Sequence, residues 1–174
     1  MKKVMVVGCP GAGKSVFSRA LSARTGLPVV HLDMLFHRPD KTERSHAEFD
    51  AALAKAMAAP AYILDGNYTR TLEIRLQACD TVFFLDYPLP LCLAGAEGRI
   101  GQKRSDFPYI EEKMDEDFRQ YILDFPQKHL FRVRAALDAV AGEKRIVTFF
   151  SRAEADAFLS ALPSAGAEQT GSPS

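Results

Sequence analysis

The feature that most constrains this chain is the octapeptide GCPGAGKS at residues 8–15. It matches the pattern G-x-x-x-x-G-K-[S/T] in full, directly after an apolar run and before a segment of helical period that extends to about Thr25. In this pattern the glycines let backbone N–H groups wrap a phosphate, the lysine reaches the β- and γ-phosphates, and the serine hydroxyl ligates magnesium. The motif predicts a strand–loop–helix unit that binds ATP with Mg²⁺.

The residues expected to bind the nucleotide all belong to this loop or to the start of the helix that follows it. Lys14 is also expected to be catalytic, because it neutralises charge on the phosphates, and Ser15 to be a metal ligand. The expected nucleotide-binding residues are Gly8, Pro10, Gly11, Ala12, Gly13, Lys14, Ser15 and Val16.

Magnesium at such a loop needs a second support, usually an acidic residue at the end of a strand beside the first one. Two apolar runs qualify, because one ends in Asp65 and the other in Asp86. Asp33 follows a third run and lies where ligands of open α/β sheets collect. We expect these strand ends to form one site, with Asp65 as the carboxylate on the metal side.

Five short apolar runs alternate with longer segments of helical period, at residues 2–7, 28–32, 61–64, 81–85 and 144–150. Runs this apolar are typical of strands buried on both faces, as in a parallel sheet covered by helices. Ser45 with Glu48, and Ser151 with Glu154, are capping boxes that predict the starts of two helices. The pattern predicts a three-layer α/β domain.

Composition limits the classes of partner. The chain has 174 residues, with 22 Lys and Arg against 22 Asp and Glu, so its net charge gives no general attraction to nucleic acid or anionic membrane. No apolar stretch approaches the roughly 18 residues of a membrane span. The three cysteines form no CxxC pair, which favours a reducing, cytoplasmic setting. We expect one domain over residues 1–162 and a flexible tail over 163–174, and the sequence carries no signal for an oligomeric state.

Charge density rises sharply over about residues 99–117, RIGQKRSDFPYIEEKMDED. The segment contains no strand-like run, so it is either a solvated helical connection or a mobile lid. Its basic residues are Arg99, Lys103 and Arg104, followed by an acidic cluster. Basic side chains on a lid would neutralise charge on a transferring phosphoryl group, and a closed lid would exclude water.

The Asp65-Gly66 pair at the end of a strand resembles the small phosphotransferases of the adenylate-kinase type. More closely, VVHLDMLF near residue 30, ILDGNY at 63–68, TLEIRL at 71–76 and the late SRAEADAFL are similar to the bacterial DNA topology modulation protein family. Relatives tend to carry tryptophans after the second strand and before the lid, and an arginine near position 95. This chain has Phe36-His37 and Ala94-Gly95 there.

The resemblance implies a P-loop kinase fold with a five-stranded parallel sheet in the order 2-3-1-4-5, a helical lid insertion, and ATP with Mg²⁺ as donor. Asp33 would touch the acceptor or a magnesium-bound water, and Asp65 would lie just outside the direct ligands of magnesium. Asn67 and Arg75 would line the acceptor pocket, with Arg75 favoured over Arg70 for an acceptor phosphate. The expected catalytic residues are Lys14, Asp33, Arg75 and Arg104, and the expected substrate-binding residues are Asp33, Asp65, Asn67 and Arg75.

The expected activity is therefore transfer of the ATP γ-phosphoryl group to a small acceptor. The resemblance favours a nucleoside monophosphate, and a nucleoside or another hydroxyl compound, with Asp33 as base, is the alternative. A different hypothesis is a nucleotide-binding regulatory protein with slow ATPase activity. An effect on DNA topology would be indirect, because the neutral composition gives no support for direct DNA binding.

Overall fold

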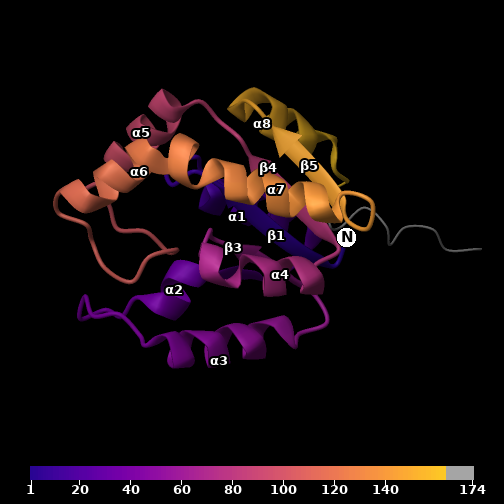
Figure 1. Ribbon diagram of the computed structural model, residues 1–174, viewed down its shortest axis with the longest axis horizontal. Helices are drawn as coiled ribbons and strands as arrows, with labels where there is room; N and C mark the ends of the chain where they lie inside the picture. Colours follow the sequence, from indigo (N-terminus) through magenta and orange to yellow (C-terminus); the bar gives the residue numbers. More distant parts are fainter. Residues whose placement is uncertain (164–174) are drawn as a thin grey trace, which may run out of the picture.

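A computed structural model of the chain describes residues 1–163, so the predicted tail lies outside the described residues except for Pro163. Five parallel strands form one sheet in the order β2-β3-β1-β4-β5, which confirms the predicted order (Figure 1). The strands are β1 (Lys3–Gly8), β2 (Val29–His31), β3 (Tyr62–Asp65), β4 (Thr81–Leu85) and β5 (Arg145–Phe149).

Helices surround the sheet on both faces. Helices α1 and α8 contact each other on one face, α4 and α7 contact each other on the opposite face, and α2 and α3 lie beside β2 (Figure 1). The helices are α1 (Lys14–Thr25), α2 (Leu32–Phe36), α3 (His46–Met57), α4 (Leu72–Ala78) after a 3₁₀ turn (Thr69–Thr71), α5 (Leu89–Glu97), α6 (Glu116–Lys128), α7 (Leu130–Val140) and α8 (Arg152–Ala161). The predicted three layers are confirmed.

The central strands are buried because helices cover them on both sides. Val4, Val6 and Val7 of β1 and Val82 and Phe83 of β4 have no exposed surface. β-branched and aromatic side chains suit this doubly covered position, which explains the unbroken apolar runs in the sequence. Within the described residues, no helix is both long and apolar enough to cross a bilayer.

Both predicted capping boxes define helix starts. The Ser45 hydroxyl accepts a hydrogen bond from the Glu48 N–H, and the Glu48 carboxylate accepts one from the Ser45 N–H. At the start of α8, Ser151 accepts from the Glu154 N–H. Each pair satisfies N–H groups that a helix leaves without intrahelical partners. These local signals fix the residues at which α3 and α8 begin.

The predicted lid contains no helix of its own, so the expectation of a helical insertion is corrected in this respect. The chain between Glu97 and Glu116 follows turns and bends, and helices only flank it. Gly101 has a left-handed φ of 74°, and Pro108 lacks the N–H that a helix would use. We call residues 98–115 the lid. Ion pairs of Arg99 and Arg104 with the carboxylates of Asp106 and Glu111 hold it, in place of the backbone hydrogen bonds of a helix.

Candidate active site

A cavity of about 1140 Å³ opens at the carboxyl ends of the parallel strands. The phosphate loop, the start of α1, the residues after β2 and β3, helix α5, the lid and the start of α8 all contribute to its lining. Ligands of open α/β sheets bind at this edge. A single small-molecule site occupies roughly 300–1,000 Å³, so this cavity has room for two substrates.

The phosphate loop forms the floor of the cavity. Of its eight predicted nucleotide-binding residues, residues 10, 11 and 13–16 line the cavity, whereas Gly8 and Ala12 do not. Gly13 caps α1 in the left-handed conformation and accepts a hydrogen bond from the Phe17 N–H at 2.9 Å. The N-terminus of a twelve-residue helix therefore points at the cavity, where it favours anions.

Lys14 folds back onto the loop that carries it. Its Nζ donates to the carbonyl oxygens of Gly8 at 3.0 Å and Cys9 at 3.1 Å. Burial lowers the pKa of Lys14 below its ordinary value, while the nearby carboxylates of Asp65 and Asp33 oppose that shift. Lys14 thus lies between the loop and two acids, within reach of a phosphate that enters the loop.

Helix α5 packs directly against the phosphate loop, backbone to backbone. A Cβ on Gly11 would lie 1.9 Å from the Cys92 carbonyl oxygen, and a Cβ on Gly95 would lie 2.1 Å from the Gly11 carbonyl oxygen. Side chains are thereby excluded from both positions. This contact explains why glycine stands at position 95 of this chain.

Gly95→Ala should displace the phosphate loop, because the added methyl group cannot fit against the Gly11 carbonyl. We expect the KM for ATP to rise by about tenfold or more, with a loss of stability of about 1–3 kcal/mol from overpacking. Gly142→Ala is the matched control, since its Cβ would meet nothing within 4 Å. Nucleotide titration of both variants and urea unfolding measure the effects, and an unchanged KM in Gly95→Ala would contradict this role.

Asp65 ends β3 beside the loop and is almost fully buried. Its Oδ2 accepts a hydrogen bond from His31 Nδ1 at 2.6 Å, whereas its buried Oδ1 makes no hydrogen bond with any described residue. A buried oxygen without a partner is costly unless a ligand satisfies it. Ser15 and Asp65 both line the cavity, so this donor set fits a magnesium ion that takes its remaining ligands from phosphate and water.

The alternative acid, Asp86, does not lie on the cavity. Its Oδ2 accepts from Arg134 Nη2 of α7 at 2.6 Å. Both acids follow strands that flank β1, but of the two only Asp65 lines the cavity, so the structure favours Asp65.

Asp33 lies at the start of α2 and is paired with a tyrosine that the sequence did not single out. The Tyr68 hydroxyl donates to Asp33 Oδ1 at 2.8 Å. Tyr68 stacks on Phe49, with centroids 4.9 Å apart and planes 29° apart, and it contacts Phe36 edge-on. Burial and the Asp33 charge both raise the pKa of Tyr68, so the hydroxyl stays protonated and donates.

Asn67 joins the loop after β3 to the first glycine of the phosphate loop. Its Oδ1 accepts from the Gly8 N–H at 3.1 Å, and its Nδ2 donates to the Gly8 carbonyl oxygen at 2.5 Å. Asn67 lines the cavity as expected, and both polar atoms of its amide hydrogen-bond to the Gly8 backbone. It therefore holds the two loops together.

The expected acceptor role of Arg75 does not fit the structure. Its side chain has no exposed surface and does not line the cavity. The guanidinium donates to the carbonyl oxygens of Gly66 at 2.8 Å and Tyr68 at 3.0 Å, and also to that of Asn67. Burial lowers the pKa of Arg75 to about 10, so the group stays charged at neutral pH. Arg75 supports the loop from below, because its donors are consumed by that loop.

The lid reaches the phosphate loop through Asp106. This carboxylate is 5% exposed and accepts from Arg19 of α1 at 3.1 Å and from Arg104 at 3.0 Å. Burial alone would raise the pKa of Asp106, but the charge of Arg104 and a hydrogen bond from Ser15 outweigh it and hold the pKa below its ordinary value. The lid thus contacts the residue expected to ligate magnesium.

Two arginines of the lid region face the cavity. Arg104 donates to Glu111 at 2.7 Å, and Arg99 lies 3.7 Å from the same carboxylate. The Nε of Arg99 is buried and makes no hydrogen bond within residues 1–163. Both positively charged guanidinium groups line the cavity together with the phosphate loop, where they can pair with the oxygens of a phosphoryl group.

The structure brings together most of the predicted site and adds residues that the sequence did not indicate. Lys14, Ser15, Asp33, Asp65, Asn67 and Arg104 all line the cavity, and Arg75 does not. The additional residues are His31, Tyr68, Arg19 and Asp106. Only His31 carried a usable signal, because it precedes Asp33 by two positions at a strand end.

No protein-family model matches the chain, and no curated protein matches it. Solved structures do match. Shikimate kinase from Bacteroides thetaiotaomicron superposes with a TM-score of 0.54 at 15% identity, over 90% of this chain and 93% of that one. A sugar kinase from Janibacter sp. superposes with a TM-score of 0.52 at 16% identity, over 92% of this chain and 91% of that one.

A deoxyadenosine kinase from M. mycoides with bound dATP gives a TM-score of 0.51 at 12% identity, over 92% of this chain and 98% of that one. Because the sequence identities are this low, these likenesses establish the fold and nothing further. The chain has the P-loop kinase fold, with the same sheet and nearly the same length as its structural neighbours.

Proposed function

We propose that this protein is a magnesium-dependent phosphotransferase that transfers the γ-phosphoryl group of ATP to a small molecule. One observation carries the proposal. Lys14 and Ser15 at the start of α1 share a cavity with two acids, Asp33 and the partnerless oxygen of Asp65, and that cavity has room for a second substrate. The kinase fold of the structural neighbours supports it.

On the donor side, the backbone N–H groups of the phosphate loop and Lys14 would bind the β- and γ-phosphates. Ser15 and Asp65 would hold magnesium, which neutralises phosphate charge when it is bound. His31 holds one oxygen of Asp65, and the other oxygen, which has no partner among the described residues, would be available to the metal. Each of these groups acts by position and charge, which is how phosphoryl transfer is chiefly catalysed.

The lid supplies further positive charge. Arg104 would exchange one of its carboxylate partners, Asp106 or Glu111, for oxygens of the transferring phosphoryl group. Arg99 would contribute its buried guanidinium in the same place. A lid closed over the loop also keeps water from the phosphoryl group and limits wasteful hydrolysis.

On the acceptor side, Asp33 and the residues after β3 would position the second substrate. Asp33 of VVHLDMLF and Asn67 of DGNY both line the cavity, which agrees with what the family resemblance implies. We propose membership of the DNA topology modulation protein family on these grounds, with any effect on DNA being indirect. The Asp-Gly resemblance favours a nucleoside monophosphate as acceptor, and a hydroxyl compound is the alternative.

The test is ADP release from ATP and Mg²⁺ in the presence of a mixture of nucleosides, nucleoside monophosphates, sugars and hydroxy acids. We expect a compound in the mixture to raise ADP release about tenfold or more over the rate with water alone, because a positioned acceptor outcompetes solvent. A slow rate that no compound changes would contradict the kinase and favour the nucleotide-binding regulatory protein.

A further inference from the structure

We infer that the phosphate acceptor is an uncharged compound with a reactive hydroxyl group, and that Asp33 takes the proton of that hydroxyl while Tyr68 positions the carboxylate. This inference rests on the proposed phosphotransferase function and names its substrate class. It replaces the nucleoside monophosphate, an anion, with a neutral acceptor such as a nucleoside or a cyclic polyol.

The first argument is the charge of the acceptor side, meaning the part of the cavity lining that comes from residues 33–69. Its members include three carboxylates, two aromatic rings and a histidine, and none of them is a lysine or an arginine. The residues are Asp33, Phe36, His37, Glu43, Asp65, Gly66, Asn67, Tyr68 and Thr69. His37 is itself 3.9 Å from Glu43. A dianionic phosphate placed here would meet like charges, and the cations close to Asp33, Lys14 and Arg99, belong to α1 and the lid and not to this part of the chain.

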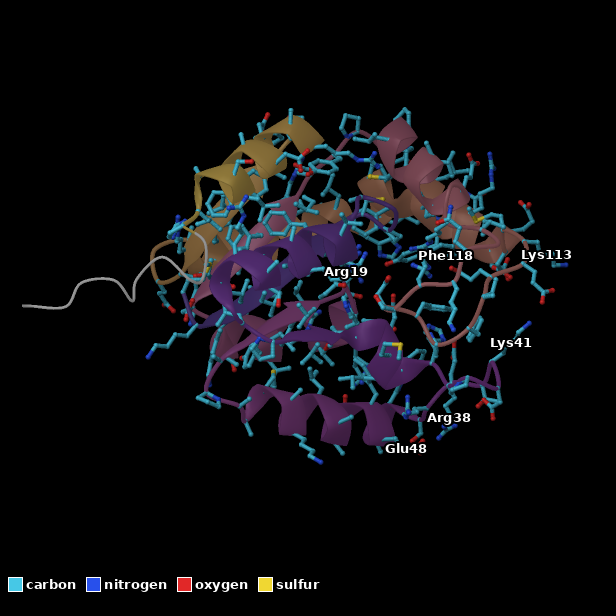
Figure 2. The ribbon with its side chains drawn as sticks, turned by 180° about the vertical axis from the view of Figure 1, so that it is seen from behind. Arg19, Arg38, Lys41, Glu48, Lys113 and Phe118 are labelled. Carbon is cyan, nitrogen blue, oxygen red and sulfur yellow. The ribbon has the colours of Figure 1, made fainter. Side chains whose placement is uncertain are left out.

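The second argument is that the arginines of this part of the chain are used elsewhere. Arg38 and Arg70 pair with carboxylates of α3, and Arg38 lies next to Glu48 at the outer edge of the α2–α3 connection (Figure 2). Arg44 donates to backbone carbonyl oxygens at the end of α2. Arg75 donates to backbone carbonyl oxygens of the loop after β3. None of the four lines the cavity. Recognition of an acceptor phosphate normally needs such guanidinium groups.

The third argument is where the cations that do line the cavity belong. They come from the phosphate loop, α1, the end of α5 with the lid, and the start of α8, and Figure 2 shows Arg19 on α1. Asp106 already holds Arg19 and Arg104 near Ser15, and Arg99 is close enough to Lys14 to lower its pKa. Most of these charges therefore lie on the side of the phosphate loop, and Arg99 is in addition close enough to Asp33 to interact with its charge. The cationic residues are Lys14, Arg19, Arg99, Lys103, Arg104 and Arg152.

Asp33 is placed to act as the base that a hydroxyl acceptor requires. Tyr68 occupies Oδ1, and within the described chain no other hydrogen bond reaches this carboxylate, so Oδ2 is left for the acceptor. Asp33 and Lys14 line the same cavity, and although burial lowers the pKa of Lys14, the Asp33 charge opposes that shift, so the acid lies near the lysine that would bind the phosphoryl group. The rings of Phe36 and Tyr68 give the acceptor an apolar wall.

The chemistry balances with ATP as the co-reactant. The acceptor hydroxyl oxygen forms a bond to the γ-phosphorus, and the bond between that phosphorus and the bridging β,γ-oxygen breaks with its electron pair going to ADP. The hydroxyl proton passes to Asp33 and then to solvent. A phosphate acceptor needs no such base at neutral pH, because its attacking oxygen is already deprotonated.

The first experiment measures ADP release with matched pairs of acceptors that differ in charge. Each nucleoside is compared with its 5′-monophosphate, and each neutral sugar with its sugar phosphate or sugar acid. We expect kcat/KM for the uncharged member of the preferred pair to exceed that of its anionic partner by about 100-fold or more, since like charges oppose the anion. Preference for the anionic member would overturn the inference and leave the phosphotransferase intact.

The second experiment compares Asp33→Asn with the control Asp50→Asn on α3. Asparagine keeps an oxygen that accepts from Tyr68 and loses the capacity to take a proton. We expect kcat for the hydroxyl acceptor to fall by about 10²–10⁴-fold, as for loss of a general base, with the KM for ATP unchanged. Asp50→Asn should retain full activity, since Asp50 only pairs with Arg70 outside the cavity.

The outcomes separate the two proposals. A loss of less than tenfold in Asp33→Asn, with full response to an acceptor, would overturn the role of Asp33 as base and with it the hydroxyl acceptor. ADP release that no member of any pair changes would contradict the phosphotransferase itself, and the inference would fall with it. Tyr68→Phe adds a check, because it keeps the ring and should lower kcat without altering the KM for ATP.

Discussion

Lys14→Ala is expected to reduce ADP release by about 10³-fold or more while leaving the fold intact. Lys14 is the cation at the floor of the cavity, and it lies close to both Asp33 and Asp65. Alanine at this position would leave two carboxylates facing the incoming phosphates without compensation. The chemical step and ATP affinity should both suffer, because the same charge binds the ground state and the transition state.

Stability should change little in this variant. Lys14 contributes two hydrogen bonds to the carbonyls of Gly8 and Cys9 beside an open cavity, where water can replace them. We expect a change in the free energy of unfolding of about 1 kcal/mol or less. Urea unfolding checks the fold, and Lys55→Ala, on the exposed face of α3, is the control for activity. ADP release at the parental rate would overturn the assignment of the phosphate loop as donor site.

The parts of the molecule that the sequence predicted correctly are those encoded locally. The octapeptide ending in Lys14 and Ser15 carries its own structural context, since the strand and helix around it follow from short-range patterns. Apolar runs locate strands buried on both faces, and the serine–glutamate boxes locate helix starts. A parallel sheet then brings strand ends together, which is why Asp33 and Asp65 could be placed in one site from sequence.

The polar pairs of the site could not be predicted, because they depend on register between strands and on loop paths. His31 meets Asp65 because the β2–β3 register pairs these two positions. Tyr68 reaches Asp33 only after the chain turns through a positive φ of 35° at the tyrosine itself. Neither contact leaves a periodic or compositional trace, so the two pairs could not be predicted, although His31 stands at a strand end two residues before Asp33.

Charge density indicated the lid but did not indicate its structure. Alternating basic and acidic residues are typical of an exposed helix face with pairs at helical spacing. Arg104 instead pairs with Asp106 two residues on and with Glu111 seven residues on, and Asp106 also reaches Arg19 of α1. These spacings suit a folded loop and not a helix. The same charges that predict a solvated helix therefore fix an irregular segment over the phosphate loop.

Arg75 shows why an arginine near a site is not always part of it. Its place after DGNY favoured contact with an acceptor phosphate. In the structure the one-turn spacing from Thr71 directs the side chain inward, where Nε donates to the Thr71 hydroxyl and carbonyl. The remaining donors bind the loop at Gly66–Tyr68, and among the described residues no carboxylate pairs with the charge. Carbonyl oxygens and the Thr71 hydroxyl satisfy this buried guanidinium.

Arg75→Ala is therefore expected to destabilise the protein by about 3 kcal/mol or more, because several buried carbonyl groups lose their donor at once. For a chain of this size that corresponds to a fall in Tm of roughly 10 °C. The loop that Arg75 supports carries Asn67 against Gly8 and Tyr68 against Asp33. The KM values for ATP and for the acceptor should consequently worsen together.

Arg70→Ala is the matched control, since Arg70 forms an exposed ion pair with Asp50 that should be worth less than about 1 kcal/mol. Arg75→Lys keeps the charge but loses the planar fork that contacts three carbonyls, so it should recover only part of the stability. Thermal unfolding and separate titrations of ATP and acceptor measure these effects. A variant as stable as the parent that loses acceptor use alone would show that Arg75 contacts the acceptor after all, by a movement that turns it into the cavity.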